Sequence, residues 1–323
     1  MGTGMQNCRT VYGQTLVELG RKDERIVVLE ADLSKTTMSC LFQAQFPRRY
    51  FEMGIGEANM VSTAVGLALC GKVAFVNSFA VFAAGRPYDQ VRQASILPGL
   101  DLKIVGSSCG LSDYGDGATH QGIEDMAIMR AVPNMTVLCP ADGEETAQAV
   151  RAAARTPGPF YIRINRNEVP DVLPAGARFR LGKPSVLRRG TEVVLFATGF
   201  MVAKSLEAAE RLAKEGVSAR VINVSTVKPL HEADVRRLAS GARAVVTAEE
   251  HSVIGGLGSA IAFALRGGGV PIECVAIADE FGQSALDYDQ LLAHYGLTAD
   301  AIARAARRAL NPSRARKPPR RPH

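Results

Sequence analysis

The stretch FEMGIGEANM (residues 51–60) places one carboxylate, Glu57, in the first turn of a helix that is otherwise small and apolar. Gly54 and Gly56 predict a turn, and the apolar run at 61–69 predicts the helix. An acidic side chain in a first turn often does no more than complement the helix dipole, which stabilises a helix by roughly 0.3–1 kcal/mol. Local sequence alone favours that structural role, and motifs elsewhere in the chain shift the balance toward function.

Apolar segments of strand length alternate with amphipathic segments on both sides of this stretch. Strands are predicted at 25–31, 72–78, 102–107, 135–140 and 159–164, and helices at 88–97, 121–131 and 143–155. Strands that are apolar on both faces and separated by helices are typical of a parallel sheet covered on both sides. The sequence therefore predicts one α/β domain over residues 1–165.

Proline and glycine interrupt this pattern, and we expect an interdomain linker over residues 166–190. A second alternation of strands and helices follows and predicts a smaller α/β domain over residues 191–310. The predicted fold class is thus two α/β domains, each with a parallel sheet. Residues 311–323, NPSRARKPPRRPH, predict a basic, proline-rich and disordered tail.

Of the net charge of +6, that tail contributes +5. Without its five basic residues, 33 basic and 32 acidic side chains remain, so no folded basic face and no nucleic-acid partner are predicted. Six scattered cysteines show neither CxxC pairs nor metal-ligand spacing, which indicates reduced thiols and a cytoplasmic location. No apolar run reaches about 18 residues, so a membrane span is not expected.

The loop YGDGATHQG (residues 114–122) brings Asp116 and His120 close together after a predicted strand. A single histidine at the start of a helix is more often a capping or packing residue. However, ligands of open α/β sheets gather at the carboxyl ends of strands. An aspartate and a histidine four residues apart on a glycine-rich loop also suit a substrate that bears hydroxyl groups.

Two further motifs could be either structural or ligand-binding. Phe79 and Phe82 stand at helical spacing just past a predicted strand; such a pair usually belongs to a core, but at a strand end a flat ring could stack on it. HSVIGGLGSA (residues 251–260) follows a strand and opens a helix, where a dinucleotide could bind. Its glycine spacing matches neither GxGxxG nor a P-loop, so a tight strand-to-helix turn is favoured.

Taken together, four motifs resemble those of one enzyme family. GIGEANM, NSFAVFAAGRPYDQVR, GDGATHQGIEDMAIMRAVPNMTVLCPAD and TAEEHSVIGGLGSA follow one another in the order and at the separations typical of the C-terminal subunit of split transketolases. The resemblance covers nearly the whole chain apart from the basic tail. It implies a thiamine-diphosphate pyrimidine-binding domain followed by the C-terminal domain of the family.

The resemblance also implies residues that bind the cofactor. Glu57 matches the glutamate that bonds the N1′ nitrogen of the aminopyrimidine, where it helps to remove the proton from the thiazolium C2 carbon. Phe79 and Phe82 match the aromatic residues that stack on the pyrimidine ring. Asp32, in EADLSK, matches an acidic residue near the cofactor.

Other matched positions face the substrate. His120 is expected to carry protons, Asp116 and Arg86 to bind the sugar, and Arg166 to meet the phosphate of a sugar phosphate. Ser108 stands where these enzymes usually have a histidine that contacts donor hydroxyls. Because serine offers one shorter donor and no titratable group, we expect an altered donor preference.

No metal ligand is predicted in this chain. Thiamine diphosphate needs Mg²⁺, and GDG at residues 115–117 lacks the asparagine spacing of the family's metal motif, so it is interpreted as part of the substrate loop. We therefore expect the diphosphate and Mg²⁺ to be held by a partner, the N-terminal transketolase subunit, in an α2β2 heterotetramer.

The expected activity is transfer of a two-carbon ketol unit from a ketose or ketose phosphate to an aldose. Two alternatives remain open. The β subunit of a 2-oxo-acid dehydrogenase has the same domains, although the DGATHQ loop favours transketolase. A catalytically silent assembly protein is opposed by intact Glu57, Phe79 and Phe82, whereas Ser108 keeps it open.

Overall fold

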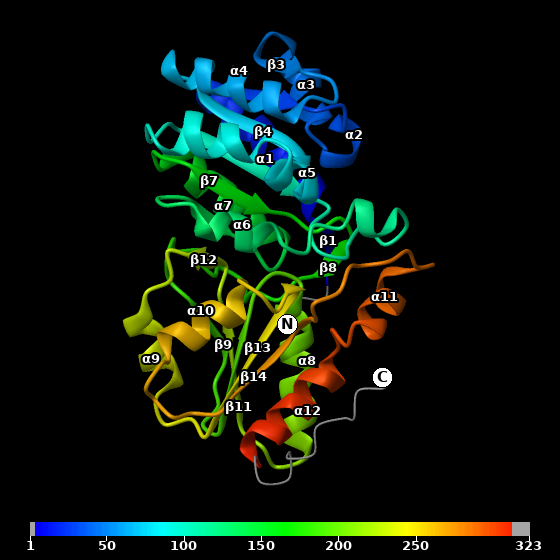
Figure 1. The fold of residues 1–323 in the computed structure, drawn as a ribbon, viewed down its shortest axis with the longest axis vertical. Coiled ribbons are helices and arrows are strands. Elements are labelled where there is room, and N and C mark those ends of the chain that lie inside the picture. Colours follow the sequence, from blue (N-terminus) through cyan, green and yellow to red (C-terminus); the bar gives the residue numbers. More distant parts are fainter. Residues whose placement is uncertain (1–3, 312–323) are drawn as a thin grey trace.

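The computed structural model describes residues 4–311 and shows two large sheets, each with helices on both faces, stacked along the long axis of the molecule (Figure 1). The N-terminal half, blue to green, forms one set of layers, and the C-terminal half, green to red, forms the other. The predicted disordered tail, apart from Asn311, lies outside the described residues.

The first sheet has seven strands in the order β12-β6-β7-β5-β4-β2-β3. Their bounds are β2 Ile26–Glu30, β3 Tyr50–Glu52, β4 Val73–Phe79, β5 Leu102–Ser107, β6 Thr136–Leu138, β7 Phe160–Arg163 and β12 Thr226–Lys228. All neighbours are parallel except β12, which pairs antiparallel with β6. The sequence pattern did not predict β12, which comes from the C-terminal half of the chain and extends the sheet of the N-terminal half.

Both faces of this sheet are covered, as predicted. On one face lie α1 (Cys8–Lys22), α3 (Cys40–Gln45) and α7 (Gly143–Arg155); on the other lie α4 (Glu57–Leu69), α5 (Ala80–Gly85), a π-helix (Gln90–Ile96) and α6 (Asp125–Ala131). Strand residues alternate between the two layers, because Val28 and Phe75 join the α1 side whereas Val27 and Val76 join the α4 side. This alternation explains why the strands are apolar throughout.

The second sheet has five strands in the order β14-β13-β10-β11-β9. Their bounds are β9 Ser185–Arg188, β10 Val193–Ala197, β11 Ala219–Asn223, β13 Ala244–Ser252 and β14 Ile272–Ile277. Only the edge strand β9 is antiparallel. The helices α8 (Met201–Lys214) and α12 (Ala299–Leu310) cover one face, and α9 (Glu232–Ala239) and α10 (Leu257–Ala264) the other. The α/β fold class is confirmed.

Short elements complete the structure. They are β1 (Met5–Asn7), which pairs with β8 (Glu168–Pro170), α2 (Ser34–Thr37), α11 (Tyr288–His294) and two 3₁₀ turns at Pro47–Arg49 and Gly117–Thr119. Segment 166–190 therefore contains two short strands, β8 and β9. No helix within residues 4–311 has both the length and the apolar composition that a bilayer crossing requires.

The glycine-rich segment 251–260 forms the tight turn that its sequence favours. Strand β13 leads into the turn and α10 begins at Leu257. The Glu249 carboxylate accepts hydrogen bonds from the backbone N–H groups of Leu257 (2.6 Å) and Gly258 (2.8 Å). A Cβ atom on Gly256 would lie 2.0 Å from Glu249 Oε2. A side chain of the protein thus fills the helix N-terminus where a dinucleotide phosphate would otherwise bind.

Candidate active site

A cavity of about 280 Å³ lies where the first sheet presents the carboxyl ends of its parallel strands. Strands β4 and β5 are neighbours there, with Phe79 opposite Ser107. The cavity is lined by Ala31, Asp32, Leu33, Ile55, Glu57, Phe82, Arg86, Thr119 and His120. Five predicted site residues, far apart in sequence, therefore share one cavity at the edge where α/β sheets bind ligands.

Glu57 enters this cavity from the first turn of α4. Gly54, at φ +65°, makes the turn before the helix in a conformation that favours glycine. The Glu57 side chain is only 4% exposed, and its Oε1 accepts a hydrogen bond from Arg86 Nη1 at 2.9 Å. Ser78 Oγ, at the end of β4, lies 3.5 Å from the same oxygen. The carboxylate therefore faces β4 and α5 across the cavity.

Two aromatic rings and an imidazole form the wall beside Glu57. Phe79 ends β4 and Phe82 lies in α5, and their rings stack with centroids 5.9 Å apart at an interplanar angle of 14°. The His120 ring meets both edge-on, with centroids 6.0 Å from Phe79 and 5.2 Å from Phe82. Phe82 lines the cavity, whereas Phe79 is buried behind it.

The Arg86 guanidinium shows what kind of group this wall accepts. It is planar, donates an N–H to Glu57, and its central carbon lies 4.0 Å from the centroid of the Phe82 ring. A flat nitrogen heterocycle could make the same stacking contact and the same hydrogen bond. Because the Arg86 side chain is 48% exposed, it can move into solvent when such a ring binds.

His120 sits at the end of the 3₁₀ turn Gly117–Thr119, on the loop that follows β5. Its Nδ1 forms a hydrogen bond with Thr119 Oγ1 at 2.9 Å, which leaves Nε2 for a ligand. Asp116 lies on the same loop and is exposed. Asp32 also lines the cavity and is exposed, and its backbone N–H donates to Glu52 Oε1 at 2.8 Å.

Arg166 is half-buried next to this cavity. It forms an ion pair with Asp113, and its guanidinium carbon lies 5.8 Å from the Phe79 ring centroid. Burial raises the pKa of the Asp113 carboxyl, although the cation beside it acts in the opposite direction. The guanidinium is therefore anchored by one carboxylate while part of it stays accessible.

Sequence reasoning missed a second arginine, Arg9, near the start of α1. Its Nη1 donates to the Thr36 carbonyl at 2.8 Å, but its Nε is buried and has no hydrogen-bond partner within residues 4–311. Burial, together with the charge of Arg166, lowers the pKa of Arg9. The guanidinium groups of Arg9 and Arg166 thus both place positive charge beside the cavity, which favours an anionic ligand. No local pattern could reveal this, because the two segments are far apart in sequence and meet where β1 pairs with β8.

Ser108 is placed differently from the other predicted substrate residues. It lies just past β5 with φ +51°, is fully buried, and its hydroxyl has no partner in the described part of the chain. The cavity wall formed by the described residues does not include it. A ligand in the cavity could therefore contact Ser108 only if it reached below the cavity wall.

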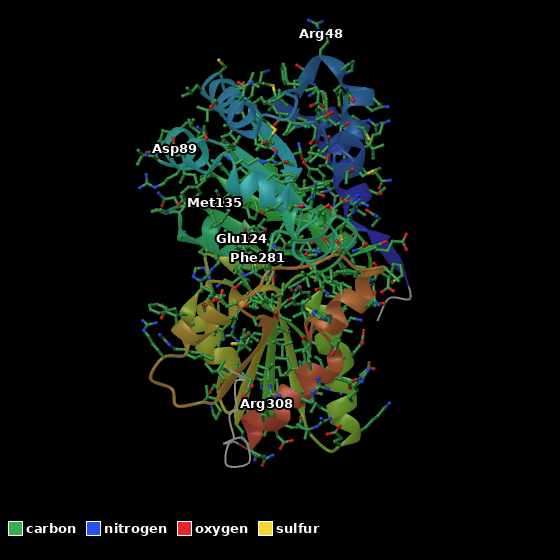
Figure 2. The ribbon with its side chains drawn as sticks, turned by 45° about the vertical axis from the view of Figure 1, so that its right-hand side comes forward. Arg48, Asp89, Glu124, Met135, Phe281 and Arg308 are labelled. Atoms are coloured by element: carbon green, nitrogen blue, oxygen red, sulfur yellow. The ribbon has the colours of Figure 1, made fainter. Side chains whose placement is uncertain are left out.

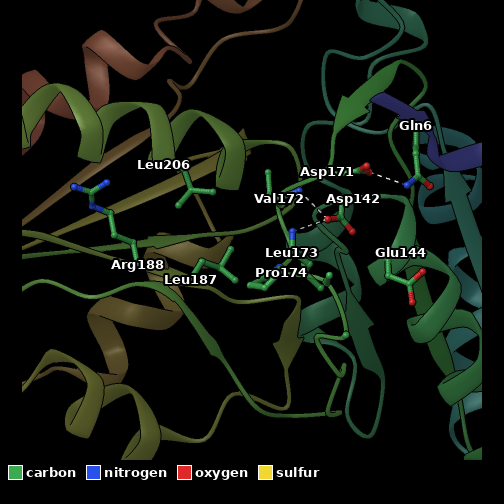
Figure 3. A pocket seen from close by; sticks show the side chains of 12 residues that line it. Gln6, Asp142, Glu144, Asp171, Val172, Leu173, Pro174, Leu187, Arg188 and Leu206 are labelled. Atoms are coloured by element: carbon green, nitrogen blue, oxygen red, sulfur yellow. Dashed lines mark hydrogen bonds between the residues drawn. The ribbon is translucent and has the colours of Figure 1, made fainter. Parts of the chain in front are cut away.

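A larger cavity, of about 730 Å³, lies between the two halves of the molecule (Figure 3). Its carboxylates already have structural partners. Asp142 accepts the backbone N–H groups of Val172 and Leu173, both at 2.9 Å, and Asp171 accepts Gln6 Nε2 at 2.7 Å. This cavity lies at the boundary between the domains, and none of the predicted site residues lines it.

Two family models, several curated proteins and solved structures match this chain. The family "Transketolase, pyrimidine binding domain" matches residues 5–172, and "Transketolase, C-terminal domain" matches residues 182–302. A putative transketolase C-terminal section of Methanocaldococcus jannaschii is 40% identical over 92% of this chain and 94% of its own length. The 6-deoxy-6-sulfo-D-fructose transketolase subunit SqwH of Clostridium sp. is 44% identical over 92% of each chain.

One solved structure is similar along almost its whole length. It is a split gene transketolase described as an inactive beta4 tetramer, with 44% identity and a TM-score of 0.86 over 95% of this chain and 99% of that chain.

Proposed function

The chain belongs to the transketolase family, and from this premise we propose that it is the C-terminal subunit of a split transketolase that uses thiamine diphosphate. It would move a two-carbon ketol unit from a ketose donor to an aldose acceptor. Its named relatives are transketolase subunits or sections, which favours ketol transfer over 2-oxo-acid oxidation or a silent assembly role.

The observation that carries this proposal is the contact set of Glu57. A buried carboxylate and an aromatic ring, Phe82, together hold a flat group that donates N–H, as the position of Arg86 demonstrates. The aminopyrimidine of thiamine diphosphate fits this description when N1′ faces Glu57 and carries the proton between them, with a ring face toward Phe82. Asp32 lines the same cavity.

When bound, thiamine diphosphate supplies the acidic carbon that attacks the ketose carbonyl and carries the two-carbon unit. Glu57 would share a proton with N1′, because its buried carboxylate faces the position proposed for that ring nitrogen. His120, edge-on to Phe82, would exchange protons with substrate oxygens through Nε2. The stacked phenylalanines would exclude water from the ring face.

The substrate is proposed to carry a terminal oxyanion, either a phosphate or a sulfonate. Arg166 and Arg9 supply the positive charge, and the unpartnered Nε of Arg9 is a free donor within the described chain. The Clostridium relative is named for a sulfonated ketose. Asp116 and Arg86 would bind sugar hydroxyls, and Ser108 would alter the donor preference.

The partner is proposed to be an N-terminal subunit that holds the diphosphate and Mg²⁺ in a cytoplasmic α2β2 complex. The two matched families cover the pyrimidine-binding and C-terminal domains, and the M. jannaschii relative is named a C-terminal section.

The test is a donor assay on the chain assembled with its N-terminal partner, thiamine diphosphate and Mg²⁺. We expect ketol transfer from D-fructose 6-phosphate or 6-deoxy-6-sulfo-D-fructose to an aldose, and much less from D-fructose. Decarboxylation of a 2-oxo acid with lipoamide as acceptor, without ketol transfer, would contradict the proposal and favour the dehydrogenase alternative.

A further inference from the structure

The first turn of the loop that carries His120 packs on a buried carboxylate of the C-terminal domain. Glu250, near the end of β13 and only 3% exposed, accepts the backbone N–H of Leu111 at 2.7 Å. Gly110, at φ +60°, packs so closely that a Cβ atom there would lie 2.6 Å from Glu250 Oε1. The first turn of the loop is therefore shaped around this side chain.

The second oxygen of the same carboxylate reaches the other edge of the site. Glu250 Oε2 accepts the hydroxyl of Tyr288 at 2.7 Å and Asn165 Nδ2 at 3.3 Å. Asn165 Nδ2 also donates to the Tyr288 hydroxyl oxygen at 2.8 Å. Because Asn165 immediately precedes Arg166, one carboxylate links the backbone that carries His120 to the backbone that carries the candidate anion-binding arginine.

The far end of the loop is held by the same domain. Gln121, next to His120, donates from Nε2 to the Gln283 carbonyl at 3.0 Å. Figure 2 shows Glu124 and Phe281, one from each domain, beside each other at this boundary, and both line a cavity of about 280 Å³. The loop is thus supported at both ends by residues that the pyrimidine-binding domain does not contain.

We propose that Glu250 is a positioning residue through which the C-terminal domain fixes His120 and Arg166 relative to Glu57. The inference rests on the proposed function, since it assumes that His120 and Arg166 act on the substrate. It assigns to the C-terminal domain a direct part in catalytic geometry. A hydrogen-bonded carboxylate can hold this geometry because each of its oxygens has a fixed donor in a buried setting.

The adjoining residue provides a matched control. Glu249 is also buried, and burial raises the pKa of both carboxyls to about 7. Its hydrogen bonds, however, stay within the C-terminal domain, at the first turn of α10. Loss of Glu249 should therefore weaken the same domain without moving the loop.

The experiment compares Glu250→Ala, Glu250→Gln and Glu249→Ala in the full chain. For the complex with its partner, kcat, KM and the cofactor Kd are measured with D-fructose 6-phosphate and 6-deoxy-6-sulfo-D-fructose. Amide hydrogen exchange over residues 109–122 and the unfolding midpoint are measured on the chain without partner. The exchange data do not depend on activity, so failure of the proposed function and failure of the positioning role remain distinguishable.

For Glu250→Ala we expect faster exchange at Leu111 and a kcat lower by about 10- to 100-fold, as misplacement of a catalytic group by about 1 Å produces, with an unchanged cofactor Kd. Glu250→Gln should recover part of kcat, because its amide oxygen can still accept the Leu111 N–H. Glu249→Ala should lower the unfolding midpoint yet keep kcat and the loop exchange of the parent.

The proposal is overturned if Glu250→Ala keeps the parent's loop exchange and kcat, or if Glu249→Ala reduces kcat to the same extent. If Glu250→Ala does not fold, Tyr288→Phe tests the proposal instead, because it removes only the Tyr288 hydroxyl, which donates a hydrogen bond to Glu250. Faster loop exchange with a several-fold lower kcat is then expected, and parent behaviour in both overturns the proposal.

Discussion

At the residue scale, the candidate site depends on two ion pairs. Glu57 is bound by Arg86, a cation that can leave for solvent, whereas Asp113 holds Arg166 in place beside the aromatic wall. These two contacts have different consequences. A ligand can replace Arg86 as the partner of Glu57. The ion pair with Asp113, in contrast, keeps the Arg166 cation fixed beside the ligand cavity.

Replacement of Arg166 by alanine should raise KM for phosphorylated and sulfonated ketoses by a factor equivalent to roughly 2–3 kcal/mol, because a charge-assisted hydrogen bond is lost. The kcat value should change little. Steady-state kinetics of the assembled complex measure both. Arg151→Ala is the matched control, since its side chain is equally exposed, 33% against 32%, but pairs with Glu18. An unchanged KM in Arg166→Ala would contradict the assigned role.

At the element scale, the end of β2 contains a carboxylate that links stability to pH. Glu30 is fully buried and accepts hydrogen bonds from Thr37 Oγ1 (2.7 Å) and Ser39 Oγ (2.5 Å). Burial nevertheless raises its pKa to about 7 from the ordinary 4.5. The folded protein then binds a proton that the unfolded chain has released between these two values.

It follows that Glu30 stabilises the fold most below about pH 4.5 and that this contribution is lost as pH rises through about 7. The free energy of unfolding should fall with rising pH by up to about 3 kcal/mol less in Glu30→Gln than in the parent. Denaturant unfolding at several pH values between 5 and 8 measures it. The exposed residue Glu210, replaced by glutamine, should behave as the parent. Identical pH dependence in Glu30→Gln and the parent would refute the linkage.

Elements with strong local patterns were predicted well from the sequence. The strand at 102–107 and the helix at 143–155 have the predicted bounds. The helix predicted from residue 121 begins only at Asp125, because Gly122 packs against Ala80 and closes the loop by accepting the Gly110 N–H. The helix predicted at 88–97 is a π-helix over Gln90–Ile96.

The missed features share one physical cause, since each depends on contacts between segments far apart in sequence. Strand β12 has three residues and exists only because β6 pairs with it. Arg9 joins the site through the pairing of β1 with β8, and Ser108 is buried away from the cavity by the turn after β5. Pattern and motif reasoning could find Glu57, Phe82 and His120, but not how distant charges combine around them.

At the scale of the whole molecule, we propose that the chain holds only the pyrimidine side of the cofactor site. The cavity beside Glu57 is about 280 Å³, and the exposed Ile55 lies on its rim. We expect the chain without its partner to bind thiamine diphosphate and Mg²⁺ with no useful affinity, because its aromatic wall and carboxylate contact only the pyrimidine. Titration calorimetry of the chain, with the assembled complex as control, measures this. Tight binding by the chain alone would contradict the split-subunit account.

The central claim is that Glu57 is the carboxylate that activates the cofactor, and proton exchange at the C2 carbon of bound thiamine diphosphate tests it most directly. Glu57→Gln in the assembled complex should keep the fold and retain the cofactor, because the amide fills the same space and can still bond the pyrimidine. Its C2 hydrogen–deuterium exchange should be far slower than in the parent, because an amide cannot pass a proton to N1′. Exchange as fast as in the parent complex would show that Glu57 does no more than complement the dipole of its helix.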